Sequence, residues 1–400
     1  MLYKVSLRLI IKGLMRRKVI TSLLFLQLAL TLGLLANSSM LAQQAYQWLT
    51  QDFGVPLDEV ISVHVLPMTP SLRHQPQLGD LITRQSSALS ALPGVNAVSF
   101  ANQALLMAGG TNQNVEDVAN QGVSNVDTVP YMQADRRLVE TLGLTLVQGA
   151  WPAMASNDEQ EPVVITQSLA TRLFGNKDPI GQQTNRGTVA AVVQDFYGQR
   201  YATSERYSLI KFGPMYSTEW GYSLLIRVSA EQRDAIKMAI PDVLRTVDIN
   251  TDIRDIHTLA EKRDLLFANE RGFAVMLAVL SGLMLLVTMG SSFSSAHFYA
   301  LNMQHEIGIK RALGASRTQV LLDVLADNWL TTTVGAALGV VTAYGLNHAL
   351  SQAIKIPAIP WWLLVGILSL LMLCVTLATL APARAATRVS PALATKALTS

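Results

Sequence analysis

The side chains that most often perform catalysis or bind metals are sparse in this sequence and do not cluster. Its histidines show no His-Glu-x-x-His pair, the spacing that puts two metal ligands on one helix face. No Gly-x-Ser-x-Gly elbow and no cysteine–histidine pairing occurs. The absence of any Gly-Lys dipeptide excludes a P-loop for nucleotide binding. We expect no metal site, no catalytic site and no cofactor bound by this chain. The histidines are His64, His74, His257, His297, His305 and His348.

Two groups of acidic residues could still do chemistry. Asp323 and Asp327 are four residues apart at the start of an apolar segment, and acidic groups at membrane depth are usually functional. The simpler use is structural, through exposure to water or pairing with Arg317 or Lys310, and a proton or ion role is the alternative. The second group, expected in a solvated surface loop, comprises Asp158, Glu159 and Glu161.

The most informative polar segment runs from Glu306 to Gln319. Its first part predicts a short amphipathic helix that stops at Gly314. Ser316 and Gln319 then have the spacing of a capping box, in which the hydroxyl and the amide satisfy free backbone N–H groups at the start of a new helix. A short helix joined through a tight bend to a longer helix can transmit a mechanical force from the short helix to the long one. An ordinary basic loop would need no such bend.

The elements around this segment are strongly apolar. Half of the residues are hydrophobic and 15% are charged, against roughly 25% charged in an average soluble domain. Charged residues are absent from windows 19–51, 272–304, 328–354 and 356–383. Each window exceeds the ~20 residues that a helix needs to cross a bilayer. We therefore predict a membrane protein with transmembrane helices at 19–42, 272–296, 320–347 and 360–382.

Charge is segregated along the chain, and the segregation predicts the topology. Residues 43–268 contain 17 basic and 24 acidic groups, whereas the remainder contains 14 basic and 4 acidic groups. Short basic segments beside spans remain in the cytoplasm. We therefore expect both termini inside and 43–268 outside, with contact between the basic segments and the lipid bilayer and none with nucleic acid. The expected cytoplasmic parts are an amphipathic interface helix at 1–18, a coupling helix at 303–318 and a tail at 383–400. A cleaved signal peptide is the alternative for the first segment.

Residues 43–268 predict an α+β extracytoplasmic domain between the first two spans. Alternating and helical patterns give one strand–helix–strand unit over 59–100 and a second over 222–256. Pro241 is expected to weaken or split the second helix. These two βαβ halves bracket an inserted subdomain at about 105–205, within which 113–125 reads as a mobile loop. The single cysteine, Cys374, lies in the fourth span, so no disulfide forms within one chain.

Small residues in the spans suggest close helix packing. Ala29 and Gly33 on the first span, and Gly335 and Gly339 on the third, have the four-residue spacing that lets helices approach closely. Such a seam could lie within one chain or between two chains, although the spacing is also common by chance. The pair Trp361-Trp362 is typical of an interfacial belt.

Four parts of the chain together resemble the MacB/FtsX-like permease family of ABC transporters. The segment from Glu306 to Ser316 is similar to the cytoplasmic signature of that family almost residue for residue. The resemblance covers the whole chain. Its other parts are Leu14–Lys18, the outer stretches Leu142–Leu144, Leu169–Gly175 and Asp178–Gln182, and the segment Pro382–Pro391.

This resemblance implies the stand-alone permease subunit of an ABC-type exporter in a bacterial inner membrane, paired with a second permease chain as a homodimer or heterodimer. ATP and Mg²⁺ would be bound by a separate ATPase subunit, whose conformational changes would move the periplasmic domain. A periplasmic adaptor and an outer-membrane channel are further implied partners. Lol-type release of lipoproteins and FtsX-like signalling to a periplasmic hydrolase are the alternatives. The residues implied in ATPase coupling are Glu306, Ile307, Gly308, Lys310, Arg311, Ala312, Gly314 and Ala315.

Overall fold

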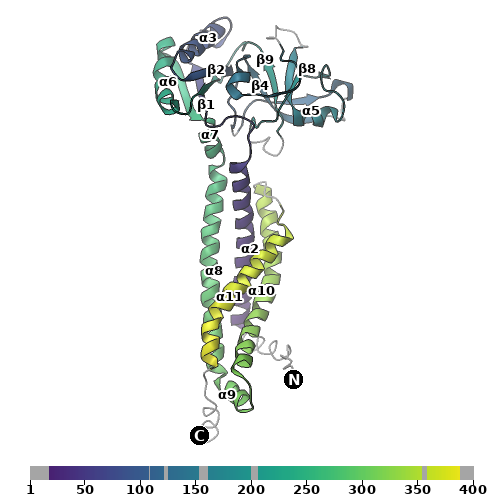
Figure 1. The fold of residues 1–400 in the computed structure, drawn as a ribbon, viewed down its shortest axis with the longest axis vertical. Helices are drawn as coiled ribbons and strands as arrows, with labels where there is room; N and C mark the ends of the chain where they lie inside the picture. The colour runs from purple at the N-terminus through teal and green to yellow at the C-terminus, as the bar shows by residue number, and fades with distance from the viewer. Residues whose placement is uncertain are drawn as a thin grey trace. The chain divides into compact units, whose positions relative to one another are not determined.

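The computed structural model describes residues 18–107, 109–120, 125–152, 161–199, 206–353 and 358–387. They form two compact units (Figure 1). We call residues 18–48 and 269–387 the helical unit, and Leu49–Ala268 the α+β unit. The interface helix expected at 1–18, apart from Lys18, and the expected tail beyond Thr387 lie outside the described residues.

The helical unit is built from four long helices and one short helix. All four long helices are long and apolar enough to cross a membrane. They overrun the predicted spans; the second, for example, continues from 296 to Asn302, because no proline or other strong helix breaker follows the apolar window. The helices are α2 (Lys18–Thr50), α8 (Ala268–Asn302), α9 (Gln304–Ala312), α10 (Arg317–Ala353) and α11 (Trp361–Ala386).

The apolar side chains of these helices face both inward and outward. One buried cluster joins α2, α10 and α11 and includes Leu32, Ala343 and Leu371. Much of α8 instead presents large apolar side chains outward, among them Leu283 and Leu286. A helix surrounded by lipid tolerates that exposure, because hydrocarbon replaces water around its side chains.

The described residues of the α+β unit form one sheet of eleven strands in two structurally distinct parts. The main strand order is β11-β1-β10-β2-β4-β9-β6-β8-β5, with β3 paired to β4 and β7 to β8. The strands are β1 (Val60–Pro67), β2 (Val95–Ala101), β3 (Asn112–Glu116), β4 (Asn125–Ala134), β5 (Leu146–Gly149), β6 (Pro162–Thr166), β7 (Gln183–Thr184), β8 (Gly187–Val193), β9 (Leu209–Phe212), β10 (Tyr222–Val228) and β11 (Thr251–Thr258). The helices are α3 (Gln77–Ser90), α4 (Leu138–Leu142), α5 (Gln167–Phe174), α6 (Arg233–Val247) and α7 (Leu259–Leu266), with 3₁₀ turns at Pro70–Arg73 and Val118–Asn120.

The first lobe consists of β11, β1, β10 and β2 with helices α3, α4, α6 and α7, of which α4 packs on β2 and β10. Strand β10 pairs with β1 on one side and β2 on the other, and β1 pairs with β10 and β11. All of these pairings are antiparallel. Alternation along β1 directs Ile61, Val63 and Val65 into a core shared with α3 and α6. Two strand–helix–strand segments from distant parts of the sequence are therefore interleaved in one layer.

The second lobe consists of β4, β9, β6, β8 and β5 with β3, β7 and α5. Its separate core includes Val163, Leu169 and Leu209. Figure 1 shows β4, β8, β9 and α5 gathered on one side of the α+β unit, and β1, β2, α3 and α6 on the other. Because β9 begins at Leu209, this lobe extends past the boundary expected at about 205.

Three local expectations from the sequence were wrong. Residues 112–116 form β3 rather than a loop, because pairing with β4 buries Val115. Pro241 lies inside an unbroken α6, whose apolar side chains are buried on both sides of it, as Ile236 and Leu244 show. That burial outweighs the lost backbone bond. Glu161 is buried and ion-paired with Lys211 rather than solvated.

Candidate functional site

The short helix α9 ends in a sharp bend that leads directly into α10. Gly314 has a φ of 95°, in the left-handed region that glycine adopts without steric cost. The Ser316 N–H donates to Gln319 Oε1 over 2.8 Å, and the Gln319 N–H donates to Ser316 Oγ over 3.2 Å. These reciprocal bonds form a capping box at the first turn of α10. The bend therefore has a defined geometry rather than that of a flexible loop.

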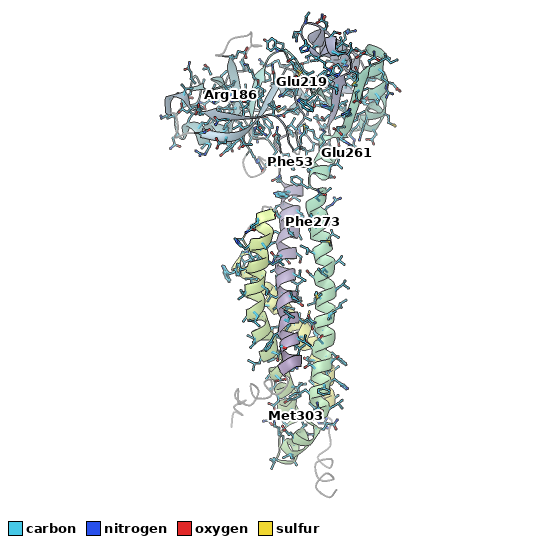
Figure 2. The ribbon with its side chains drawn as sticks, turned by 180° about the vertical axis from the view of Figure 1, so that it is seen from behind. Phe53, Arg186, Glu219, Glu261, Phe273 and Met303 are labelled. Atoms are coloured by element: carbon cyan, nitrogen blue, oxygen red, sulfur yellow. The ribbon has the colours of Figure 1, made fainter. Side chains whose placement is uncertain are left out.

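One face of α9 is buried against the long helices. Ile307 is 5% exposed and packs in a cluster with Ala300 of α8, Val320 of α10 and Ala383 of α11. Gly308 is also buried. Figure 1 shows α9 at the end of the helical unit where α8 and α10 meet, and Figure 2 labels Met303 at the turn before it. The short helix is thus held by three of the four long helices.

Two cationic side chains attach α9 to its neighbours. Lys310 Nζ lies 2.9 Å from Asp323 Oδ2 on α10, and Arg311 Nη1 donates to the Thr387 carbonyl oxygen, at the end of α11, over 2.8 Å. Asp323 therefore has a structural partner, one of the two pairings considered from the sequence. A displacement of α9 would act directly on both α10 and α11.

The opposite face of α9 is exposed and partly apolar. We call Glu306, Ile309, Ala312 and Leu313 the α9 ridge; all four are exposed. Ile309 is 43% exposed and Leu313 is 83% exposed. The i, i+4 spacing of Ile309 and Leu313 places both on one helix face. Of the residues assigned to coupling from the sequence, Glu306, Ala312 and Gly314 are exposed, and Ala315 is partly exposed.

The structure brings all four small residues of the predicted seam into one contact between α2 and α10. A Cβ at Gly335 would lie 2.8 Å from Leu28 Cβ, and one at Gly339 would lie 3.3 Å from Ala29 Cα. A Cβ at Gly33 would lie 3.2 Å from Thr342 Oγ1. The seam therefore lies within one chain, where the small size of glycine and alanine allows the two backbones to approach closely.

Polar side chains reinforce this seam inside the apolar layer. Asn37 Nδ2 donates to the carbonyl oxygens of Gly33 (2.9 Å) and Ala343 (3.1 Å), and Thr342 Oγ1 donates to that of Ala29 (2.9 Å). Such bonds between helices are worth about 0.6 kcal/mol each on average. The helices α2 and α10 are therefore joined by close packing and by hydrogen bonds, which favours their movement as one body.

The contact between α2 and α8 is made by hydroxyl and amide groups. Thr31 Oγ1 lies 3.0 Å from Thr288 Oγ1, and Gln27 Nε2 donates to the same Thr288 oxygen over 3.3 Å. Further along, Ser281 Oγ donates to Ser38 Oγ over 3.1 Å. The described part of this contact has no counterpart to the glycines of the α2–α10 seam, because a Cβ added at Gly282 or Gly290 of α8 would meet nothing within 4 Å.

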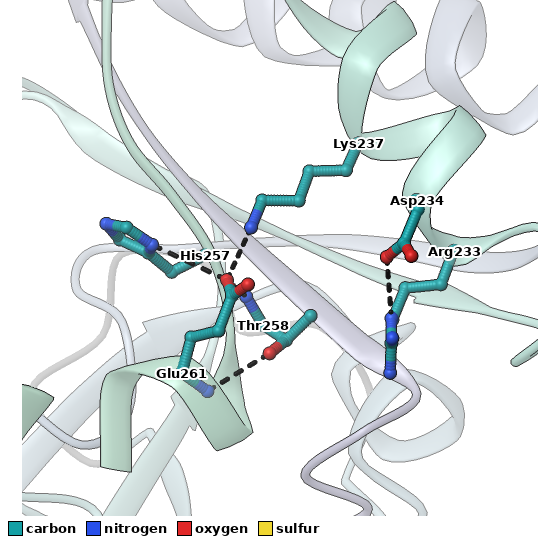
Figure 3. Close-up of polar contacts among 6 residues, drawn as sticks. All are labelled: Arg233, Asp234, Lys237, His257, Thr258 and Glu261. Atoms are coloured by element: carbon teal, nitrogen blue, oxygen red, sulfur yellow. Dashed lines mark hydrogen bonds and ion pairs between the residues drawn. The ribbon is translucent and has the colours of Figure 1, made fainter. Parts of the chain in front are cut away.

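In the α+β unit, α7 is the last element before α8 and is firmly attached to the first lobe. Thr258 Oγ1 accepts from the Glu261 N–H (3.1 Å), and Glu261 Oε2 accepts from the Thr258 N–H (2.9 Å) and from Lys237 Nζ of α6 (2.5 Å), as Figure 3 shows. Partial burial acts to raise the pKa of Glu261, but these hydrogen bonds outweigh it and hold the pKa below its ordinary value. Glu261 thus links α7, β11 and α6.

Within the described ranges, no group of three or more His, Cys, Asp or Glu side chains lies close enough together to hold a metal ion. The geometry that stands out is instead mechanical. It consists of a short helix with an exposed apolar ridge, a fixed bend, and long helices joined by close contacts.

Comparison with known proteins places these features in a family. Residues 26–243 match the MacB-like periplasmic core domain, and residues 278–391 match the FtsX-like permease C-terminal domain. The chain is 22% identical to the uncharacterized ABC transporter permease YknZ of Bacillus subtilis, over 96% of this chain and 97% of YknZ. It is 23% identical to the macrolide export ATP-binding/permease protein MacB of Bdellovibrio bacteriovorus, over 48% of this chain and 32% of that protein.

Two solved structures also align with part of the chain. The periplasmic region of MacB from Actinobacillus actinomycetemcomitans aligns with a TM-score of 0.34 and 14% identity, over 55% of this chain and 98% of that one. The extracellular domain of YknZ from Gram-positive bacteria aligns with a TM-score of 0.33 and 13% identity, over 49% of this chain and 99% of that one. The assignment rests on the family matches, of which the first alone covers more than half of the chain. The chain is a membrane protein that belongs to the MacB/FtsX-like family of ABC transporter permeases.

Proposed function

We propose that this chain is the membrane subunit of an ABC-type exporter and passes ATP-driven movement from a separate ATPase subunit to its α+β unit. The observation that carries the proposal is the α9 ridge. Leu313 and Ile309 are exposed at a point held by Lys310 and Arg311, and exposed apolar side chains on a rigid element are typical of a docking surface for another protein.

The proposal also includes a membrane topology. The α9 ridge lies on the cytoplasmic side of an inner membrane with both termini, and the α+β unit lies on the periplasmic side between the first two spans. Charge supports this arrangement, because the basic excess flanks the spans while residues 43–268 carry the acidic excess. Trp361 and Trp362 are exposed at the start of α11, where an aromatic belt would meet the opposite interface.

The ATPase is proposed to be another polypeptide that binds ATP and Mg²⁺. The sequence contains no Gly-Lys dipeptide, and its alignment with YknZ spans nearly the whole of a protein named as a permease. A second permease chain completes the proposed complex. Export is suggested by the MacB relatives, which are named for it. A periplasmic adaptor and an outer-membrane channel are further proposed partners.

The test is co-purification of the full chain with the ATPase of its host in detergent or nanodiscs. Leu313→Asp should weaken ATPase binding by on the order of tenfold or more, as expected for the loss of an exposed apolar anchor. The thermal stability of the permease should be unchanged, because Leu313 is 83% exposed. Ile307→Ala is the matched variant on the buried face of the same helix, and it should lower stability.

Retention of full ATPase binding by the Leu313→Asp variant would contradict docking at the α9 ridge. ATP hydrolysis by the purified chain alone would contradict the separate ATPase. A drop in ATPase binding that merely parallels a loss of thermal stability would also count against the ridge, since it would reflect unfolding.

A further inference from the structure

The two lobes of the α+β unit are joined by very little sheet. Strands β2 and β4 pair antiparallel through a single residue pair, Ala101 with Ala134. Within the lobes the ladders are longer, as in β1 and β10, which pair from Val60 to Val65. The two hydrophobic cores have no residue in common. The strand order therefore runs through both lobes without a break, but the pairing between β2 and β4 is limited to one residue pair.

Helix α4 follows β4 in the chain but packs on β2 and β10, and Arg227 Nη1 donates to the Glu140 carbonyl oxygen over 3.0 Å, so α4 moves with the first lobe. The polar contacts between β2 and β4 themselves gather around one point. The Asn102 N–H donates to the Gln133 carbonyl oxygen and the Gln133 N–H donates to Asn102 Oδ1, both over 2.9 Å. Ser99 Oγ donates to Asp135 Oδ1 over 2.6 Å. Bonds that cluster at one point oppose separation of the lobes but resist rotation about that point poorly.

The chain that leaves α2 is fastened to the second lobe. Phe53 is 2% exposed, and its ring centroid lies 5.3 Å from that of Tyr197, whose N–H donates to the Phe53 carbonyl oxygen over 3.1 Å. Gly54 has a φ of 73°, and a Cβ there would lie 2.2 Å from the Asp195 carbonyl oxygen. The Asp195 carboxylate in turn accepts from the Ser168 N–H of α5 over 2.8 Å. Figure 2 labels Phe53 in the α+β unit.

The chain that enters α8 is fastened to the first lobe. It leaves through α7, whose Leu259 is fully buried and whose Glu261 is bonded to Lys237 of α6. A short strap connects the two attachments, because the Ala260 N–H of α7 donates to the Leu57 carbonyl oxygen over 3.0 Å. Between Gly54 and Leu57 the strap contains only Val55 and Pro56.

We propose that the two lobes rotate as separate bodies about the β2–β4 junction, and that α2 acts on the second lobe while α8 acts on the first. A relative shift of these two helices then opens or closes the lobes, and the strap limits the range. The drive by the helices rests on the proposed function above, whereas the hinge itself does not.

The hinge can be measured in the full chain in nanodiscs. Spin labels carried by unnatural amino acids replace Met238 on α6 and Arg172 on α5, both exposed. The distance distribution between lobes should be about twofold wider than within-lobe distributions, since the lobes are separately stabilised bodies. Matched controls pair Met238 with Thr83 in the first lobe and Arg172 with Thr145 in the second. Equal widths for all three pairs would overturn the hinge.

A cross-link supplies a second test. Ala101→Cys with Ala134→Cys joins register partners, which lie within reach of a disulfide. With Cys374→Ser as background, oxidation adds one more bond at the pivot, so the distance distribution between the lobes should keep its width. The control pair Glu116→Cys with Asn125→Cys, register partners within the second lobe, should leave it unchanged. Narrowing to the within-lobe width in the oxidised junction variant would show that the lobes separate at the junction instead of rotating about it, and would contradict the proposal.

The attachment of α2 has its own measurement. Phe53→Ala should raise the hydrogen-exchange rate of the Tyr197 amide by about tenfold. That amide donates to the Phe53 carbonyl oxygen, and the contact between the two rings holds this carbonyl in place. Exchange at Leu225, in the centre of the first lobe, is the control and should not change. Unaltered exchange at Tyr197 would contradict the attachment. None of these measurements requires the ATPase, so their results are independent of the docking test.

Discussion

Glu261 shows how one side chain can hold the base of a helix. Its carboxylate accepts bonds from Thr258 and Lys237, which hold its pKa below its ordinary value despite partial burial. Because the pKa is lower in the folded state, the ionised group stabilises the fold above the unfolded-state pKa. That stabilisation is lost as the pH falls through the folded-state pKa.

We therefore expect Glu261→Gln to lower the free energy of unfolding of the α+β unit by about 0.2–1 kcal/mol at neutral pH, the range of exposed ion pairs. Glutamine keeps the capping box, so the loss reports the charge. The difference from the unsubstituted protein should shrink as the pH falls through the folded-state pKa of Glu261 and vanish below it, where both side chains are neutral. Urea unfolding at the two pH values measures it. The control is Asp264→Asn, which removes a pair with the adjacent Arg263 and should change little. A pH-independent deficit would contradict the argument.

Single residues also mark the limit of reading the sequence. The spacing of Ser316 and Gln319 is local, so their capping box can be anticipated from sequence. The orientation of α9 cannot. Ile307 and Ile309 are the same residue type two positions apart, yet one is buried by α8, α10 and α11 while the other is exposed. Only the packing of distant helices decides which isoleucine is available to a partner.

At the scale of elements, the α2–α10 seam gives the sharpest stability prediction. Gly339→Ile should destabilise the helical unit by about 1–3 kcal/mol, the usual cost of overpacking, because its Cβ would already meet Leu32 and Ala29. Gly345→Ile is the matched control on the same helix, where nothing lies within 4 Å. Thermal unfolding in detergent compares the two. Equal effects at both positions would show that the seam does not limit stability.

The long helices could be predicted from sequence, because a helix that crosses the bilayer needs a long window without charged residues. The prediction of four apolar helices and an α+β domain is confirmed. Strand β3 could not be predicted, since Asn112–Glu116 contains one large apolar residue and owes its pairing to β4. The interleaving of β1, β10 and β11 was equally hidden, because strand order depends on contacts between residues far apart in sequence.

At the scale of the whole molecule, the α+β unit should fold without the helices. Leu49–Ala268 is compact by itself, and its two cores draw no residue from the helical unit. Residues 51–268 expressed alone should therefore be soluble, with hydrogen-exchange protection in β1 and β10 equal to that in the full chain. An excised unit without protected amides would show that the long helices supply part of its stability.

The weak β2–β4 junction also has a consequence for how such a protein can diversify. The first lobe has a complete core of its own, and the second is inserted between β2 and β10. A different second lobe could be grafted at the same place without redesigning the membrane helices. The graft would have to pair with β2 at Ala101, as Ala134 does, and to offer an aromatic ring against Phe53 and a backbone carbonyl beside Gly54, as Tyr197 and Asp195 do here. The lobe is thus an exchangeable module whose compatibility depends on a few contacts at β2 and at Phe53 and Gly54.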